Sequence, residues 1–182
     1  MASLEQLTPA ALQALLQDGK LAGSWTLDAA RTEVLLETRH TWGLLPLHGV
    51  FRKVSGSGTV TAAGDATGII TVNAESIDTK NPQRDKHLRS GDFFDIDNHP
   101  DFTFATESAS PAADGLRITG SLTVRGTTRP VSFDAKVSVA DGEAVLDGEL
   151  PVNRADYGLT WNFLGIAAMD NTIAVHAVFT RG

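Results

Sequence analysis

The segment RDKHLRSGDFFDIDNHPDF, from Arg84 to Phe102, gathers aspartates and two histidines within nineteen residues. Carboxylate and imidazole groups are what metal sites and acid–base catalysis use. Four alternate positions resemble the start of a calcium-binding loop: Asp95, Asp97, His99 and Asp101. Such a loop also needs Gly at its sixth position and Glu at its twelfth, which here are Pro100 and Thr106. The spacing therefore does not predict a calcium site.

A zinc site or an enzyme active site would use the histidines. His87 and His99 are too far apart for the helical His-x-x-x-His pair, and no third ligand is indicated. His40 ends an apolar strand face, where a single imidazole is usually a hydrogen-bonded core group. The chain has no Gly-x-Ser-x-Gly, Walker or GxGxxG motif. A small hydrolase or metal-dependent enzyme using His40 or the His87 and His99 region stays as an alternative.

A structural role explains the same segment with common residue preferences. Pro82 can open a short helix near residues 82–90, with Leu88 as its apolar contact and Arg84 to Lys86 as solvated charges. Phe93 and Phe94 would anchor the loop that follows. We therefore interpret this segment as a scaffold, with Arg84 and Asp85 as partners that hold it in shape.

The composition excludes several classes of protein to which the chain could otherwise belong. The chain has 182 residues, of which 42% are hydrophobic, and 15 basic against 22 acidic residues give a net charge of -7. This charge disfavours nucleic acid as a partner, and the absence of cysteine excludes disulfides and thiolate chemistry. Glu5 stands where an export signal needs positive charge, and no run of about 20 apolar residues could span a bilayer. We expect a cytoplasmic protein without a transmembrane segment.

The first residues predict an amphipathic helix. Thr8 and Pro9 form an N-cap and first-turn pair, Gly19 terminates the helix, and one face carries Leu12, Leu15 and Leu16. We assign residues 1–22 to this helix and its linker, and residues 23–182 to the main domain. The Leu face could cover one mouth of a barrel, or pack against a second copy of the chain in a homodimer.

After this helix, apolar and polar residues alternate with the period of a β-strand. The alternation covers residues 31–40, 49–54, 68–72, 102–104, 116–125, 131–139, 143–152 and 173–180. Each strand has one apolar and one polar face, which is typical of antiparallel sheets with one face on the core. We predict an all-β domain of about eight antiparallel strands. The pattern does not distinguish a sandwich from a closed barrel.

Several segments resemble the YceI-like family in order and spacing, over about residues 24–181. They are SWTLD (24–28), the strand ending in His40, GVF (49–51), SIDT (76–79), RDKHLRSGDFFD (84–95), HPDFTF (99–104), GLRITGSLTVRGTTRP (115–130) and NRADYGL (153–159). The resemblance implies an extended lipocalin-like antiparallel β-barrel whose interior binds a polyisoprenoid such as an isoprenoid quinone. It implies no catalytic residues, and we expect no metal site and no required cofactor. The chain departs from the family in having His99 where an aromatic residue is usual, and a helix where many members have an export signal.

The resemblance and the strand pattern together predict a lipid-binding lumen, used for carriage or storage of a long-chain polyisoprenoid. From the apolar faces we expect its lining to include Val34, Leu36, His40, Phe102, Phe104, Leu116, Ile118, Phe133, Trp161, Phe163, Val175 and Phe179. Such a site needs volume and apolar lining rather than a sharp motif. A further alternative, a stress-related interaction protein with a filled core, predicts no cavity.

Overall fold

A computed structural model describes residues 6–40, 45–113, 115–162 and 167–182; at positions 39, 40 and 45 it describes the backbone but not the side chain. Within these ranges the fold consists of eleven strands, two α-helices and two 3-10 helices. The strands are β1 (Gly23–Leu27), β2 (Glu33–His40), β3 (Leu45–Phe51), β4 (Val54–Val60), β5 (Ala66–Asn73), β6 (Ile77–Asp78), β7 (Asp101–Ala112), β8 (Gly115–Val124), β9 (Thr127–Ala140), β10 (Glu143–Asn153) and β11 (Asp170–Arg181). The helices are α1 (Pro9–Gln17), α2 (Pro82–Arg89), η1 (Ala74–Ser76) and η2 (Arg154–Tyr157).

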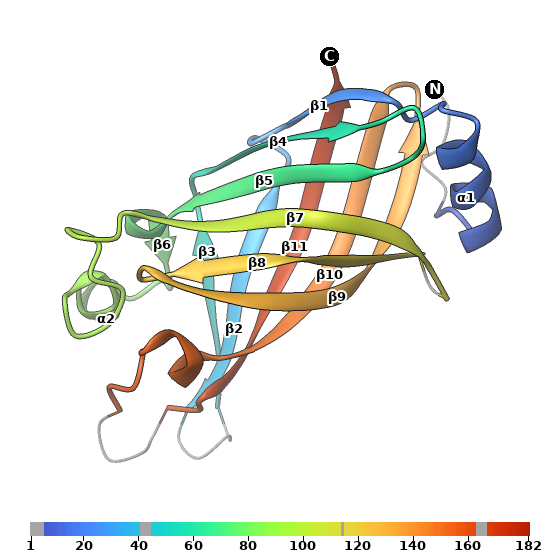
Figure 1. The fold of residues 1–182 in the computed structure, drawn as a ribbon. Coiled ribbons are helices and arrows are strands. Elements are labelled where there is room, and N and C mark those ends of the chain that lie inside the picture. The colour runs from blue at the N-terminus through green and yellow to red at the C-terminus, as the bar shows by residue number, and fades with distance from the viewer. Residues whose placement is uncertain (1–5, 41–44, 114, 163–166) are drawn as a thin grey trace.

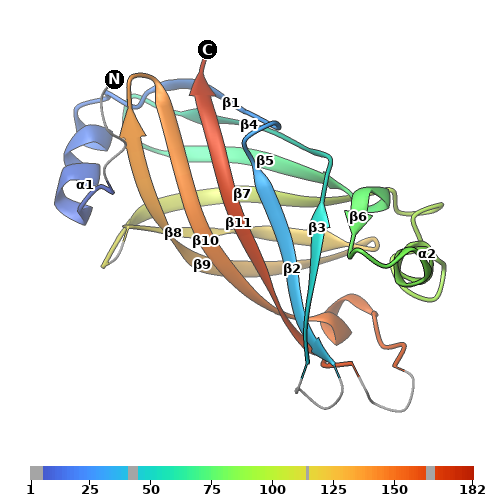
Figure 2. The ribbon, with the colours of Figure 1, turned by 180° about the vertical axis from the view of Figure 1, so that it is seen from behind.

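The sheet closes into a barrel, as the family resemblance implies. Its strand order is β1-β4-β5-β7-β8-β9-β10-β11, and β1 also pairs with β11, so these eight strands form a ring. All of the pairings are antiparallel, which confirms the predicted all-β class. Figures 1 and 2 show α1 beside one end of the barrel and α2 beside the other.

One edge of β11 pairs with β10, and its other edge, in a strand of twelve residues, is long enough to pair with both β1 and β2. Its last residues pair with β1, where Phe179 lies opposite Leu27. Its first half pairs with β2, where Val175 lies opposite Val34. β2 then pairs with β3, and β3 with the short β6. The wall is thus extended beyond the closed ring at the α2 end (Figure 2).

Both predicted helices are present, and α1 has the predicted Thr8 cap and Gly19 end. The Thr8 hydroxyl accepts a hydrogen bond from the Ala11 amide at 3.3 Å, and Gly19 follows α1 with a φ of 65°. Asn81 caps α2 by accepting from the Arg84 amide at 3.1 Å. None of the helices in the described ranges is long and apolar enough to cross a membrane.

Several strands differ from the sequence prediction. The pattern at 49–54 indicates one strand, but the structure ends β3 at Phe51 and begins β4 at Val54. β1, β4 and the short β6 were not predicted as separate strands. β4 contains Gly56 and Gly58, residues with low strand propensity, and it forms because it pairs on both sides, with β1 and with β5.

The apolar side chains form two clusters. The larger lies within the barrel and toward α2, and includes Phe51, Phe94 and Phe102. The smaller lies under α1 and joins Leu12 to Trp25 and to Val137 of β9. The face of α1 therefore packs on the barrel of its own chain.

Candidate ligand-binding cavity

Several inward-facing apolar side chains are only half-buried, although a closed barrel surrounds them. Ile70, Phe104, Phe133 and Val175 belong to this group. Protein interiors are close-packed, so an apolar side chain that remains accessible on the inner face must border a space. The barrel thus contains a cavity, which a protein with a filled core would not have.

The cavity has a volume of about 250 Å³ and is lined by α1 and by all eight strands of the ring. Within the described ranges, no charged side chain and no histidine lines it. Its polar side chains are hydroxyls: Ser57, Thr59, Thr67, Thr103 and Thr106. A buried charge would find no compensating group here, whereas hydrocarbon would lose only its contact with water.

Eight residues of the expected lining border this cavity. They are Val34, Phe102, Phe104, Leu116, Ile118, Phe133, Val175 and Phe179. Leu36 packs against the larger cluster without lining the cavity. The side chain of His40 and the whole of Phe163 lie outside the described residues.

Trp161 does not line the cavity. Its side chain is 44% exposed, and its ring lies 4.2 Å from the ring of His87, measured between centroids. Trp161 follows η2 in the connection to β11, so the alternation of a strand does not set its direction. Trp161, expected in the lining as an apolar aromatic residue, instead lies partly exposed in this loop.

The expected lining named no residue of α1 or β1, although covering a barrel mouth was one of the two roles expected for the Leu face of the helix. Leu12 and Leu16 of α1 and Trp25 of β1 all border the cavity. The Leu face of the helix was recognised, but its position relative to the barrel is a tertiary property. Ile70 and Val72 were recognised as alternating strand residues and also line the cavity.

Two glycines make room for the aromatic rings inside the barrel. A Cβ atom on Gly120 would lie 2.9 Å from Cζ of Phe104, and one on Gly148 would lie 2.8 Å from Cε2 of Phe133. Both distances are too short for real Cβ contacts. The two rings meet edge to face, with centroids 5.7 Å apart.

The α2 end of the barrel is packed with aromatic rings. Phe94, which is 3% exposed, contacts Phe102 at 5.0 Å and Phe51 at 6.3 Å between centroids. Phe93 packs edge to face on Phe94 at 5.0 Å. The predicted anchoring role of Phe93 and Phe94 is confirmed, since these rings join the α2 loop to β3 and β7.

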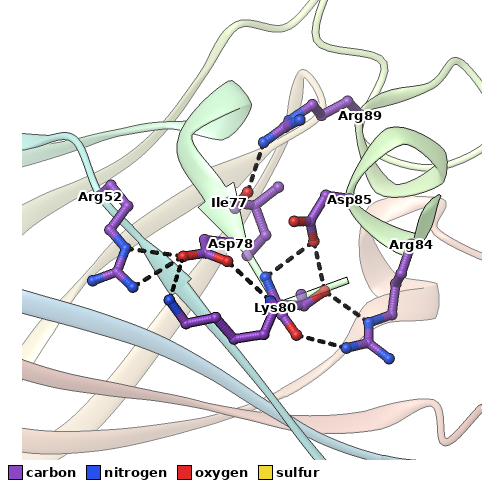
Figure 3. A network of polar contacts seen from close by, with 8 residues as sticks. Arg52, Ile77, Asp78, Lys80, Arg84, Asp85 and Arg89 are labelled. Atoms are coloured by element: carbon purple, nitrogen blue, oxygen red, sulfur yellow. Dashed lines mark hydrogen bonds and ion pairs between the residues drawn. The ribbon is translucent and has the colours of Figure 1, made fainter. Parts of the chain in front are cut away.

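A polar network holds the chain between β6 and α2 (Figure 3). Arg84 donates from Nε to the Thr79 hydroxyl at 2.8 Å and from Nη2 to the Thr79 carbonyl at 2.7 Å. Asp85 accepts from the amide and hydroxyl of Thr79. Arg84 and Asp85 thus act together, as predicted, but through Thr79. The expectation of a solvated Asp85 was wrong: it is 7% exposed because it satisfies the buried donors of Thr79.

Two more side chains extend this network. Arg89 donates to the carbonyls of Glu75 at 2.7 Å and Ile77 at 2.8 Å. Asp78 accepts from the Lys80 amide at 2.9 Å, from Lys80 Nζ at 3.0 Å and from Arg52 Nη2 at 3.0 Å. These hydrogen bonds hold the pKa of Asp78 well below its usual range. The charged side chains of this network therefore hold backbone groups in place.

The histidines of the opening segment lie against different neighbours. His87 packs on Trp161 and Phe93, whereas the ring of His99 lies beside Gly126 of the β8–β9 turn. Asp95 has a φ of 54° and accepts from Asn98 Nδ2 at 3.0 Å, so it closes a turn. Across the described ranges, no three His, Asp or Glu side chains come close enough to hold a metal ion.

Comparisons with known proteins agree with this architecture. Residues 25–180 match the model of the YceI-like domain. A UPF0312 protein of Pseudomonas aeruginosa (strain LESB58) is 30% identical over 164 residues, covering 82% of this chain and 83% of that protein. The YceI protein of Escherichia coli O157:H7 is 40% identical over 93 residues, covering 50% and 49% of the two chains.

Solved structures with the same fold include BcnA of Burkholderia cenocepacia, with a TM-score of 0.76 and 23% identity over 84% of this chain and 98% of that one. Another is a polyisoprenoid binding domain from Saccharophagus degradans, with a TM-score of 0.70 and 14% identity over 87% and 98% of the two chains. At these identities the likeness concerns the fold. The family match covers nearly the whole barrel, and the chain belongs to the YceI-like family.

Proposed function

We propose that this protein binds a polyisoprenoid or isoprenoid-quinone-type lipid in the barrel cavity, as a carrier or store and without catalysis. The observation that carries this proposal is the cavity itself: it is enclosed by eight strands and has no charged lining residue among those described. A polyisoprenoid offers hydrocarbon along its length and one polar head group, so this lining suits its tail.

Burial of hydrocarbon supplies the affinity in this proposal. Each Å² of apolar surface removed from water contributes about 25 cal/mol, less the cost of ordering the chain. The half-buried rings of Phe104 and Phe133 would complete their own burial against the lipid. Protein and ligand would therefore both lose apolar surface to water.

The fold of a polyisoprenoid binding domain from Saccharophagus degradans supports the same class of ligand. The enzyme alternative has less support, because the histidines of the opening segment pack in separate places and Asp85 and Asp78 serve the backbone network.

Organic extraction of purified protein, followed by mass spectrometry, tests the proposal. The protein should be prepared without detergent, and extracts of an unrelated β-barrel protein purified in parallel serve as the control. We expect an isoprenoid specifically in this extract, or uptake of an added isoprenoid in titrations followed by tryptophan fluorescence, because Trp25 borders the cavity. A protein that carries no lipid and takes up no isoprenoid would overturn the proposal.

A further inference from the structure

α1 supplies part of the cavity wall. Leu12 is 1% exposed, and its side chain and that of Leu16 both border the cavity. Leu15, on the same face of α1, packs into the smaller apolar cluster but does not border the cavity. Two side chains of this helix thus define where the cavity ends, and a third contributes to packing alone.

This wall is attached to the barrel on both sides of the helix. Before α1, the Leu7 amide donates to the Val137 carbonyl of β9 at 2.8 Å. After α1, Arg181 of β11 donates to the Lys20 carbonyl, and its guanidinium lies 5.0 Å from the centroid of the Trp25 ring. The helix is therefore held across this end of the barrel rather than attached by one terminus.

The neighbouring β4–β5 turn packs directly on the same helix. A Cβ atom on Gly64 would lie 3.1 Å from Cβ of Leu16, so a side chain there would press on the helix. Next to the turn, the cavity lining includes the exposed residues Thr59 and Thr67. The cavity thus reaches the surface beside α1, at the ends of β4 and β5 that adjoin their connecting turn.

The volume of the cavity limits the chain that it can enclose. An engineered apolar cavity of about 150 Å³ binds benzene, which has six carbon atoms. By that measure a cavity of about 250 Å³ encloses about ten carbon atoms, or two isoprene units. A longer chain must therefore project past α1 or displace it.

We infer that Leu12 and Leu16 determine chain length: they set how many isoprene units the barrel encloses. The inference rests on the proposed function. Replacing leucine by alanine removes three carbon atoms, so replacing both residues frees the space of about six, slightly more than one isoprene unit. The number of enclosed units should therefore change by one.

The test is a titration series with geraniol, farnesol and geranylgeraniol, which contain two, three and four isoprene units. Binding is measured to the full chain and to the variants Leu12→Ala, Leu16→Ala and the double variant. Leu15→Ala is the matched control, since it removes the same atoms from the same helix face outside the cavity. Thermal unfolding establishes that each variant is folded.

We expect the double variant to gain at least about tenfold in affinity for farnesol relative to geraniol, compared with the unmodified chain, because one more unit is buried. Leu16→Ala should show part of this gain, and it keeps the test valid if loss of the deeply buried Leu12 prevents folding. Ala109→Leu should act in the opposite direction, because Ala109 borders the cavity on β7, which contacts α1.

The outcomes separate the two proposals. If the unmodified chain binds none of the three alcohols, the proposed function itself is contradicted. If it binds them, but the Leu12 and Leu16 variants keep its length preference or Leu15→Ala shifts that preference equally, α1 does not determine length and the lipid-binding function stands.

Discussion

The amide and the hydroxyl of Thr79 both donate hydrogen bonds to Oδ1 of Asp85, at 3.0 Å and 2.5 Å. Both residues are buried, so water cannot replace Asp85 as the acceptor. The hydroxyl of Thr79 also accepts from Arg84, which links β6 to α2. An acidic residue within a charged segment is here a structural part of the fold.

Asp85→Ala should lower the free energy of unfolding by about 3 kcal/mol, because it leaves two buried donors of Thr79 unpaired. Asp85→Asn keeps an acceptor oxygen and should lose less. Chemical denaturation measures both values. Asp92→Ala, at an exposed position of the same segment, is the control and should change stability by less than about 0.5 kcal/mol. Equal losses in Asp85→Ala and Asp92→Ala would contradict this assignment.

Val175→Trp should block lipid uptake, because the indole ring would fill part of the cavity that Val175 borders. We expect at least about a tenfold loss of affinity for an isoprenoid alcohol, measured by titration calorimetry. Ala174→Trp adds a ring to the adjacent position, which faces the opposite side of β11, and should bind normally. Unchanged binding in Val175→Trp would show that the lipid lies elsewhere.

Arg154→Lys should destabilise the connection between η2 and β11. The buried guanidinium donates to the carbonyls of Leu159 at 2.6 Å, Trp161 at 2.8 Å and Ala168 at 3.0 Å. Burial lowers the pKa of Arg154, and a lysine ammonium cannot reproduce the planar fork of donors that the guanidinium offers. We expect a loss of about 2 kcal/mol in the free energy of unfolding and faster amide hydrogen exchange in residues 155–162.

Arg129→Lys is the matched control for this substitution. Arg129 is exposed and donates to a single carbonyl, that of Asp156, at 3.1 Å. Its replacement should leave hydrogen exchange in the connection nearly unchanged. If Arg154→Lys and Arg129→Lys changed hydrogen exchange equally, the hydrogen bonds of Arg154 would not be what orders the connection between η2 and β11.

Asp78 should make the free energy of unfolding decrease at acidic pH. Hydrogen bonds from Lys80 and then Arg52 depress its pKa in the folded state, so the stability it contributes is fully present above the pKa of an unfolded aspartate, about 3.9. That contribution is lost as pH falls below about 4 toward the folded pKa. Asp78→Asn should therefore be less stable than the unmodified chain near neutral pH, with a difference that shrinks in acid. Denaturation curves between about pH 3 and 7 measure this.

A matched substitution outside the network separates a local effect from a change in net charge. Asp97→Asn removes one carboxylate from an exposed loop position. A stability difference that stays constant with pH for Asp78→Asn would contradict the role of its hydrogen bonds.

Local chemistry in the sequence determined the elements of the fold. The alternation at 131–139 predicts which side of β9 faces inward, since side chains on a strand alternate between its two faces. Thr8 and Asn81 accept the first helical amides, and a Pro follows each, so the starts of α1 and α2 are encoded by adjacent residues. Eight of the residues expected in the lumen border the cavity for this reason.

The tertiary structure decided what depends on residues distant in the chain. β4, rich in glycine and serine, is a strand because β1 and β5 lie on either side of it. Asp85 is buried because Thr79 needs an acceptor, and Trp161 is exposed because a loop carries it away from the barrel. The position of α1 and the volume of the cavity follow from how all the elements pack together. Periodicity along one segment specifies which face is apolar, whereas the space that this face encloses depends on strand register and closure of the whole barrel.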